Sequence, residues 1–220
     1  MEKLLVFAPH PDDDVIGCGG TIARNTAQGN QVAIVYLTSG ESGSLSYSPA
    51  ELSVVREEEA TRAAALLGVN DVIFLRQPDG YIAWSKLLMD ALVTVIRSQQ
   101  PSMVFLPHGQ EEVRDHQQSC ELILEACKRA AGPWFPDCGQ QSWSVDKILA
   151  YEVWTPLERY NLAVDISDFM QLKLDALREH RSQVTDIAYD EAIQGLNRYR
   201  GITSGTGRYA ECFQLIKTTI

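Results

Sequence analysis

Residues 3–20 read KLLVFAPHPDDDVIGCGG: a short apolar run, then a histidine, three aspartates and a glycine-rich stretch. The run at 3–8 has the length and composition of a buried strand, and the helical pattern at 15–28 ends at Gly29. A strand followed at once by a helix is typical of folds in which the two elements alternate. The stretch therefore predicts an α/β fold whose first strand carries polar residues at its carboxyl end.

The same alternation continues along the chain. Apolar strands that alternate with helices are typical of a mostly parallel sheet with helices on both faces. We therefore predict a Rossmann-like, three-layer α/β fold in which residues 1–220 form a single domain. Region 132–145 is expected to be irregular, and the tail around 199–213 has a mixed pattern. The further strands expected are 31–38, 71–75, 102–107, 147–154 and 162–166, and the further helices are 50–67, 84–100, 117–131 and 168–181.

The chain is acidic, with a formal net charge of -10 over 220 residues. Because an acidic surface repels phosphate groups, neither nucleic acid nor an anionic membrane surface is expected as a partner. No membrane span is expected, since no apolar stretch approaches the ~18 residues that a span needs. No signal peptide is expected either, and the 5 cysteines form no CxxC pair. We therefore expect reduced cysteines and a cytoplasmic protein.

A histidine and three acids, His10 and Asp12 to Asp14, follow the first predicted strand. Crowded carboxylates raise one another's pKa values unless a cation lies nearby. Imidazole and carboxylate together suit zinc or iron(II) better than calcium or magnesium, so the cluster predicts a metal site. The simpler alternative is that the three acids only cap and charge the first turn of the helix.

The glycines of the first helix offer another interpretation. Gly17, Gly19 and Gly20 could form a phosphate-binding loop, but Ile22 stands where the last glycine of GxGxxG would be. We instead expect these glycines to let the helix pack closely against the sheet.

A second cluster, His108, Asp115 and His116, follows the predicted strand at 102–107. The carboxyl ends of parallel strands meet at one edge of a sheet, so the two clusters are expected to converge there. Zinc hydrolases commonly use three protein ligands and leave one position for water. His10, one aspartate and His116 would make such a set. Of the other polar residues, His180 is expected to be structural and Glu111 and Glu112 to be solvated loop charges.

These motifs resemble those of the N-acetylglucosaminyl-phosphatidylinositol deacetylase family, also called PIG-L or LmbE-like. APHPDDD at 8–14 is similar to the family's AHPDDE signature, and VRDH at 113–116 falls where the family has HxDH. Shorter similarities follow in the expected order, so the resemblance spans nearly the whole chain. They are GES at 40–42, RxxE at 56–59, PDG at 78–80, YEVW at 151–154 and YAECF at 209–213.

The resemblance implies a metal site and a general base. It implies that zinc is bound by His10, Asp13 and His116, although iron(II) accepts the same ligands. It also implies that Asp12 removes a proton from a water molecule activated by the metal. Asp14 stands where the family usually has glutamate, and a supporting or structural role is expected for it.

Three further charged residues, Glu41, Arg56 and Asp79, match positions that bind substrate hydroxyl groups in the family. Each has a simpler explanation. Arg56 could pair with Glu59 one helical turn away. Asp79 could be a turn residue before a glycine, and Glu41 could be solvated.

One position departs from the family pattern. The family's HxDH begins with a histidine that serves the leaving amine or the oxyanion, but Val113 stands there in this chain. Asp115, implied to orient that histidine in the catalytic centre, would lack its partner. Our hypothesis is that Asp12 acts twice, as base and then as acid, with His108 as a helper.

The function that the resemblance implies is zinc-dependent hydrolysis of the acetamide of an N-acetyl amino sugar, giving a free amine and acetate. The partner is then a small N-acyl amino-sugar molecule, and a homo-oligomer is left open. Three alternatives remain. The substrate could be another amide, such as a thiol conjugate; Val113 could mark a protein that binds metal and sugar without turnover; or the Gly17–Gly20 region could bind a nucleotide.

Overall fold

The computed structural model describes residues 1–139, 141–185 and 187–219. In this part of the chain, seven strands form one sheet in the order β3-β2-β1-β4-β5-β7-β6. The strands are β1 (Lys3–Ala8), β2 (Gln31–Thr38), β3 (Asp71–Gln77), β4 (Met103–Pro107), β5 (Lys147–Tyr151), β6 (Leu162–Asp165) and β7 (Ala210–Thr218).

The order of the strands reverses between β1 and β4, near the centre of this sheet. Strands β1 to β5 pair in parallel, whereas β7 runs antiparallel to both β5 and β6. The chain proceeds from β1 through β2 to β3 on one side and then crosses to β4 on the other side of β1. In open α/β sheets ligands bind at such a switch point, beyond the carboxyl ends of the strands. The loops after β1 and β4 occupy this place.

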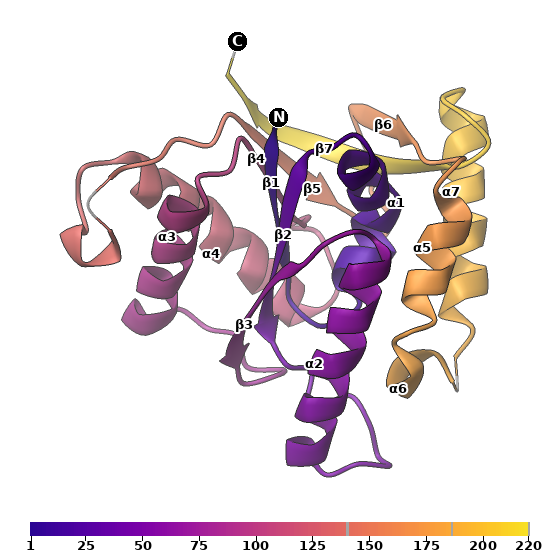
Figure 1. Cartoon of the computed structure of the whole chain (residues 1–220), viewed down its shortest axis with the longest axis horizontal. Helices are drawn as coiled ribbons and strands as arrows, with labels where there is room; N and C mark the ends of the chain where they lie inside the picture. Colours follow the sequence, from indigo (N-terminus) through magenta and orange to yellow (C-terminus); the bar gives the residue numbers. More distant parts are fainter. Residues whose placement is uncertain (140, 186, 220) are drawn as a thin grey trace.

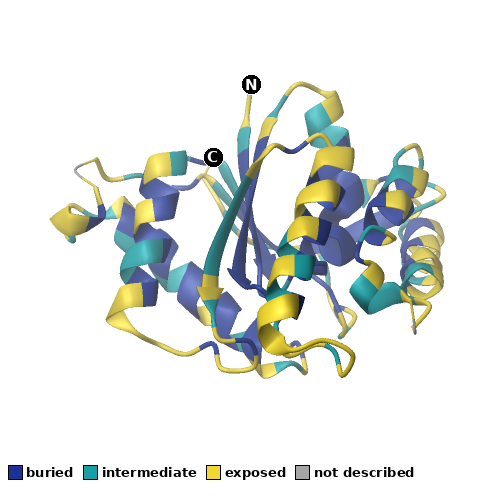
Figure 2. Cartoon of the chain, turned by 60° about the horizontal axis from the view of Figure 1, so that its bottom comes forward, coloured by how far each residue is buried: buried dark blue, intermediate teal, exposed yellow. Residues whose placement is uncertain are grey.

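Helices cover both faces of the sheet, which confirms the predicted three-layer α/β fold (Figure 1). Helices α3 and α4 pack on one face, and α1, α2, α5 and α7 lie on the other. The central strands are buried on both sides, and the helices turn exposed residues outward (Figure 2). The helices are α1 (Asp13–Ala27), α2 (Pro49–Leu66), α3 (Lys86–Gln99), α4 (Arg114–Ala131), the 3-10 turn η1 (Pro136–Cys138), α5 (Met170–Leu177), α6 (Arg181–Val184) and α7 (Tyr189–Ser204).

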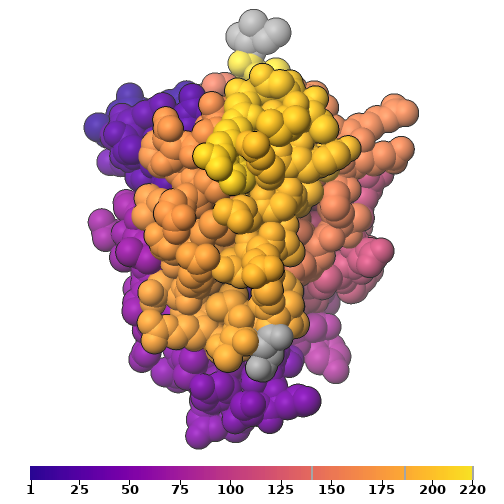
Figure 3. Space-filling model, turned by 90° about the vertical axis from the view of Figure 1, so that its right-hand side faces the viewer, coloured from indigo at the N-terminus to yellow at the C-terminus, as the bar shows by residue number. Residues whose placement is uncertain are grey.

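The C-terminal part differs from the sequence-based expectation. Helix α5 ends at Leu177, before the predicted end at 181, and the tail with the mixed pattern contains α7 and the long strand β7. Helix α7 buries Asn197 and Arg200 alongside Ile193, so its inward face lacks the apolar periodicity by which helices are recognised. In Figure 3, α5 and α7 together cover one side of the molecule.

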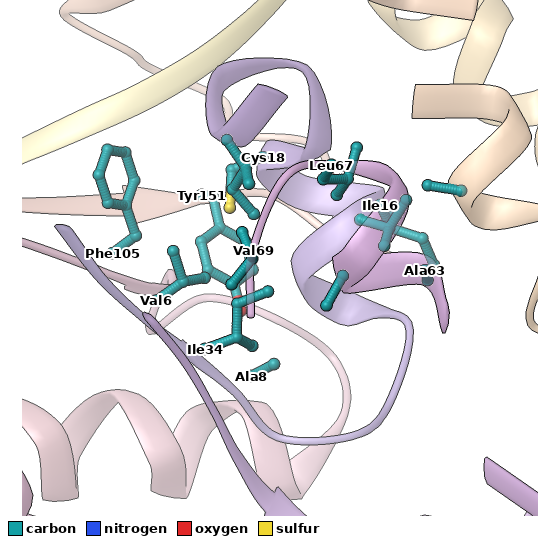
Figure 4. Close-up of a cluster of buried hydrophobic side chains, with 14 of the residues drawn as sticks. Val6, Ala8, Ile16, Cys18, Ile34, Ala63, Leu67, Val69, Phe105 and Tyr151 are labelled. Carbon is teal, nitrogen blue, oxygen red and sulfur yellow. The ribbon is translucent and has the colours of Figure 1, made fainter. Parts of the chain in front are cut away.

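The glycines of α1 allow close packing, as predicted. A Cβ atom on Gly17 would lie 2.2 Å from the Tyr151 ring, and one on Gly20 would lie 2.7 Å from the Ile166 side chain. Figure 4 shows Tyr151 beside Cys18 among the buried apolar side chains on this face of the sheet. The Tyr151 hydroxyl donates a hydrogen bond to the Phe7 carbonyl at 2.7 Å. Larger residues at these glycines would push α1 away from the sheet.

A buried ion pair fastens α1 to the C-terminal elements. Lys173 of α5 and Glu211 of β7 are both fully buried, and their charged atoms lie 2.7 Å apart. The Glu211 carboxylate also accepts hydrogen bonds from the backbone N–H groups of Gly20 and Thr21. These groups follow Cys18, where the helical backbone of α1 is interrupted. The carboxylate thus serves as the N-terminal cap of the second part of α1.

Candidate metal centre

The loops after β1 and β4 bring the two predicted clusters together. His10 and Asp13 come from the β1–α1 turn, whereas Asp115 and His116 lie in the first turn of α4. The backbone N–H of His10 donates to the Asp13 carboxylate at 2.8 Å, which closes this turn. Apart from His10, whose ring is partly exposed, these side chains are almost fully buried.

Three donor atoms form a nearly equilateral triangle. His10 Nδ1 lies 3.2 Å from Asp13 Oδ2, and His116 Nε2 lies 3.3 Å from each of these two atoms. Ligand atoms about 2.0–2.1 Å from a tetrahedral zinc ion lie about 3.3 Å apart, so the triangle fits one such ion. Two imidazoles and a carboxylate are also the donor types that zinc and iron(II) accept.

The second nitrogen of His10 is oriented by two carboxylates. Its Nε2 lies 3.2 Å from Asp115 Oδ2 and 3.1 Å from Asp79 Oδ1, and a proton on Nε2 leaves Nδ1 free for a metal. Asp115 also accepts hydrogen bonds from the backbone N–H groups of Gly80 and Ile82. Asp115 therefore fixes both His10 and the loop after β3, a role that needs no histidine at position 113.

The carboxylates around His10 favour a positive charge beside its ring. Burial lowers the pKa of His10, but hydrogen bonds with Asp115, Asp13 and Asp79 raise it well above its ordinary value. For Asp13 the effects are opposite in sign. Burial raises the pKa of its carboxyl group, but the His116 and His10 rings lower this pKa well below its usual range. The carboxylates thus favour a positive charge at the triangle, which a metal ion would provide.

Glu111, which we expected to be solvated, is fully buried beside the site. It accepts hydrogen bonds from the backbone N–H groups of Val153 at 2.7 Å and Thr155 at 3.1 Å. Its Oε2 also lies 3.8 Å from Nδ1 of His116, the nitrogen that faces away from the triangle. This distance is too long for a hydrogen bond, so Glu111 acts on the His116 ring through its negative charge. Nothing in the local sequence distinguishes Glu111 from its neighbour Glu112, whose side chain is exposed.

We expect Glu111→Gln to weaken metal binding by about 10–100-fold, because the amide leaves His116 without a charged partner. Competition with a chromogenic chelator measures the metal affinity. Glu112→Gln is the matched control, since it makes the same change at an exposed neighbouring position. Equal metal affinities for the two variants would contradict the assigned role.

Asp12 lies at the N-terminus of α1 in a strained backbone conformation, with φ 124° and ψ -28°. Its carboxylate is buried, and Oδ2 lies 3.3 Å from a guanidinium nitrogen of Arg56. Burial raises the pKa of Asp12 to about 7, against the opposing effect of the Arg56 guanidinium. A carboxylate with a pKa near neutrality is suited to take up and return a proton. Strain of this kind is typical of functional positions.

The strain at position 12 predicts an unusual order of stability. We expect Asp12→Gly to be more stable than Asp12→Ala by about 1 kcal/mol, because only glycine adopts positive φ without strain. Both variants remove the carboxylate, so their difference isolates the backbone contribution. Urea unfolding monitored by circular dichroism measures it, and an alanine variant as stable as the glycine variant would refute the assigned strain.

The three residues expected to contact substrate differ in their placement. Arg56 is buried and donates hydrogen bonds to the carbonyls of Gly40 and Pro11, not to Glu59. Asp79 accepts a hydrogen bond from the Ser42 N–H at 2.9 Å. Arg56 and Asp79 both line the opening above the metal triangle. Glu41 instead accepts a hydrogen bond from the backbone N–H of Asp79 and supports that loop from outside the opening.

His108, the expected helper, has both ring nitrogens engaged away from the opening. Its Nε2 lies 2.7 Å from the Thr155 carbonyl, and its Nδ1 accepts a hydrogen bond from the Gln110 N–H at 3.1 Å. This geometry favours a structural role in holding the loop after β4. His180 is fully buried just before α6, and burial lowers its pKa to about 3.

Asp14 is fully buried, and burial raises the pKa of its carboxyl group to about 7, against the opposing effect of a contact with the Tyr36 hydroxyl. It lies outside both the metal triangle and the residues that line the opening. This position is consistent with the supporting role expected for it.

A cleft of about 280 Å³ opens above the metal triangle. Besides the residues already described, Gly43, Trp154 and Gln183 line it, and none of the three was predicted as a site residue. Trp154 follows β5, and Gln183 lies in α6, so the C-terminal third of the chain completes the cleft. Trp154 belongs to the YEVW similarity, but that short match assigned it no role, and only the fold places Trp154 and Gln183 here.

The fold and the site together define an α/β protein with a candidate His₂Asp metal site at the switch point of its sheet. The chain belongs to the PIG-L family, described as GlcNAc-PI de-N-acetylase, whose model matches residues 5–127. Members of this family are generally metal-dependent deacetylases, hydrolases that act on N-acetyl amide bonds. Within the described residues, no helix is long and apolar enough to cross a membrane.

Individual relatives cover nearly the whole chain. The diacetylchitobiose deacetylase of Thermococcus kodakarensis is 33% identical over 98% of this chain and 84% of its own length. The structure of the N,N'-diacetylchitobiose deacetylase from Pyrococcus horikoshii superposes with a TM-score of 0.90 at 33% identity, covering 98% of this chain and 84% of that one. GalB, the 4-carboxy-2-hydroxymuconate hydratase from Pseudomonas putida, has a TM-score of 0.89 at 25% identity, covering 100% and 98%.

Proposed function

We propose that this protein is a zinc-dependent N-deacetylase that hydrolyses the acetamide of an N-acetyl amino sugar to a free amine and acetate. The observation that carries the proposal is the triangle of His10, Asp13 and His116, with donor atoms 3.2–3.3 Å apart beside the Asp12 carboxylate. Relatives with 33% identity over nearly the whole chain are named as deacetylases of an N-acetylated disaccharide.

His10, Asp13 and His116 would hold the metal. When bound there, a zinc ion supplies Lewis acidity that polarises an amide carbonyl and lowers the pKa of water. Asp12 takes the proton of the attacking water, because its carboxylate lines the same cleft beside the metal-binding residues. Asp12 then returns a proton to the leaving amine, since Val113 offers none and His108 is engaged elsewhere.

Arg56 and Asp79 orient the sugar in this proposal. Arg56 is held by two backbone carbonyls, and Asp79 is held by the Ser42 N–H, so both side chains are fixed before substrate binds. A fixed guanidinium and carboxylate at the cleft wall offer a donor and an acceptor to neighbouring hydroxyl groups. The 5 cysteines are all unpaired and buried, which supports the expectation of a reducing, cytoplasmic environment.

A free-amine assay tests the proposal. The purified chain is incubated with N-acetylglucosamine and N,N'-diacetylchitobiose before and after dialysis against a chelator, and then with zinc or iron(II) restored. We expect amine release that the chelator abolishes and zinc restores. Elemental analysis of the protein as isolated identifies the metal. No amine from either sugar, with full metal loading, would overturn the proposal in favour of another amide substrate, another reaction such as hydration, or binding without turnover.

A further inference from the structure

Strand β3 contains one extra residue shortly before the loop that reaches the candidate metal centre. Tyr36 and Thr38 of β2 are two positions apart, whereas their partners Phe74 and Gln77 are three positions apart. Arg76 lies in this bulge with a φ of 50°, in the left-handed region that favours glycine. Bulges near a site redirect the chain that follows them. The bulge at Arg76 therefore sets the direction in which the chain leaves β3.

The Arg76 side chain joins the bulge to helix α2, which lies beside β3 at the edge of the sheet (Figure 1). Arg76 Nε and Nη2 each donate a hydrogen bond of 2.9 Å to a different oxygen of the Glu57 carboxylate. The Ser39 hydroxyl donates a third hydrogen bond to this carboxylate at 2.6 Å. Paired N–H groups of a guanidinium fix a carboxylate in direction as well as in distance. These three residues, the outer cluster, thus connect β3, α2 and the loop after β2.

Each segment that the outer cluster connects also carries a residue of the cleft above the metal triangle. Asp79 follows β3, Arg56 lies on α2, and Ser42 lies in the loop after β2. Arg56 donates a hydrogen bond to a carbonyl of this loop, and the Asp79 carboxylate accepts one from the Ser42 N–H. The residues of the outer cluster are absent from the lining of the cleft, so they act on a substrate only through these neighbours.

A hollow of about 400 Å³ lies between the loop after β2, the start of α2 and the outer cluster. Glu41 lines this hollow and accepts a hydrogen bond from the Asp79 backbone N–H at 2.8 Å. Because a hollow takes the place of packed side chains here, polar contacts determine where the loop lies. The outer cluster thereby determines whether Asp79 stays close to His10, whose Nε2 lies 3.1 Å from its carboxylate.

We propose that Arg76 is a positioning residue for Asp79. The bulge at Arg76 directs the chain toward the metal triangle, and the ion pair with Glu57 fixes that direction. The inference rests on the proposed function, in which Asp79 orients the sugar beside the metal. Arg76 itself is exposed and lies outside the cleft, so its effect on the reaction passes through Asp79.

Steady-state kinetics of the metal-loaded enzyme with N,N'-diacetylchitobiose test this role. Arg76→Gln and Glu57→Gln each remove one charge of the pair. We expect each to raise KM about tenfold and to change kcat by less than about threefold, because Asp79 positions the sugar but transfers no proton. The double variant should resemble either single variant, since the two residues act as a unit.

Glu58→Gln is the matched control, because it makes the same change at the next position of α2, where the side chain is exposed. This variant should have the KM of the wild type. An unchanged KM in both Arg76→Gln and Glu57→Gln, or effects that add in the double variant, would overturn the inference.

Amide hydrogen exchange followed by NMR measures the positioning without turnover. In Arg76→Gln the N–H groups of Ser42 and Asp79 should exchange at least about tenfold faster than in the wild type, because the loops that they join open more often. The N–H groups of Gly20 and Thr21 in α1 are the control and should exchange at the wild-type rate.

The exchange rates also separate this inference from the proposed function. Faster exchange at Ser42 and Asp79 in a chain that releases no amine would leave the positioning role standing and overturn the deacetylase. Amine release by the wild type, together with wild-type exchange at these two N–H groups in Arg76→Gln, would do the reverse.

Discussion

Asp12→Asn is expected to reduce kcat by about 10²–10⁴-fold, the range typical for loss of a general acid–base group. Asparagine has nearly the same shape but cannot accept a proton at neutral pH. Because the side chain keeps its size and the surrounding chain is unchanged, the strained turn at φ 124° should persist. Free-amine release measures kcat, and atomic absorption measures the metal content. The metal content should stay at the wild-type level, because Asp12 is outside the triangle of donor atoms.

Asp13→Asn is the matched neighbour of this variant. It makes the same chemical change one residue later, at a carboxylate that lies 3.2–3.3 Å from both ligand histidines. We expect it to lose metal as well as activity, since a neutral amide is a poorer ligand. Loss of metal from Asp12→Asn, or near-normal turnover by that variant, would show that proton transfer has been assigned to the wrong carboxylate.

The sequence predicts the first half of the fold well because its elements are locally marked. Strands β1, β2 and β4 are apolar and buried on both faces, and α2 begins with a capping box at Ser48 and Glu51. In the C-terminal half, α7 directs Asn197 and Arg200 inward. Asn197 donates to the Ala210 carbonyl, and Arg200 pairs with the buried Glu152. Burial there depends on specific polar partners, and these partners are known only from the fold.

The residues of the candidate site also form two groups: those that the sequence suggests and those that only the fold brings to the site. The candidate metal ligands His10, Asp13 and His116 can be proposed from the sequence, because metal ligands come from a few residue types and here follow the carboxyl ends of strands. Glu111 lies among charged loop residues, and Trp154 and Gln183 come from distant segments of the chain. Their contribution depends on how β5 and α6 pack against the β1–α1 turn. Asp115 was predicted, but only the fold shows that it accepts hydrogen bonds from the backbone N–H groups of Gly80 and Ile82, which give it a role without a preceding histidine.

The largest expected effect on stability comes from Lys173→Met. This change leaves Glu211 buried without its cation, and breaking a buried pair on one side costs about 3–5 kcal/mol. The loss should reach α1 directly, because Glu211 holds the N–H groups of Gly20 and Thr21. Urea unfolding followed by circular dichroism measures the change in the free energy of unfolding.

A double variant and a surface control make this expectation specific. Adding Glu211→Gln to Lys173→Met removes the unpaired charge but keeps an amide oxygen for the two N–H groups, so about 1–2 kcal/mol should be recovered. Lys147→Met removes an exposed pair with Glu2, whose charged atoms lie 3.7 Å apart, and should cost less than about 1 kcal/mol. If Lys173→Met were as mild as Lys147→Met, the buried pair could not be what fastens α1. The position of Asp13 in the first turn of α1 would then depend on the apolar packing of that helix alone.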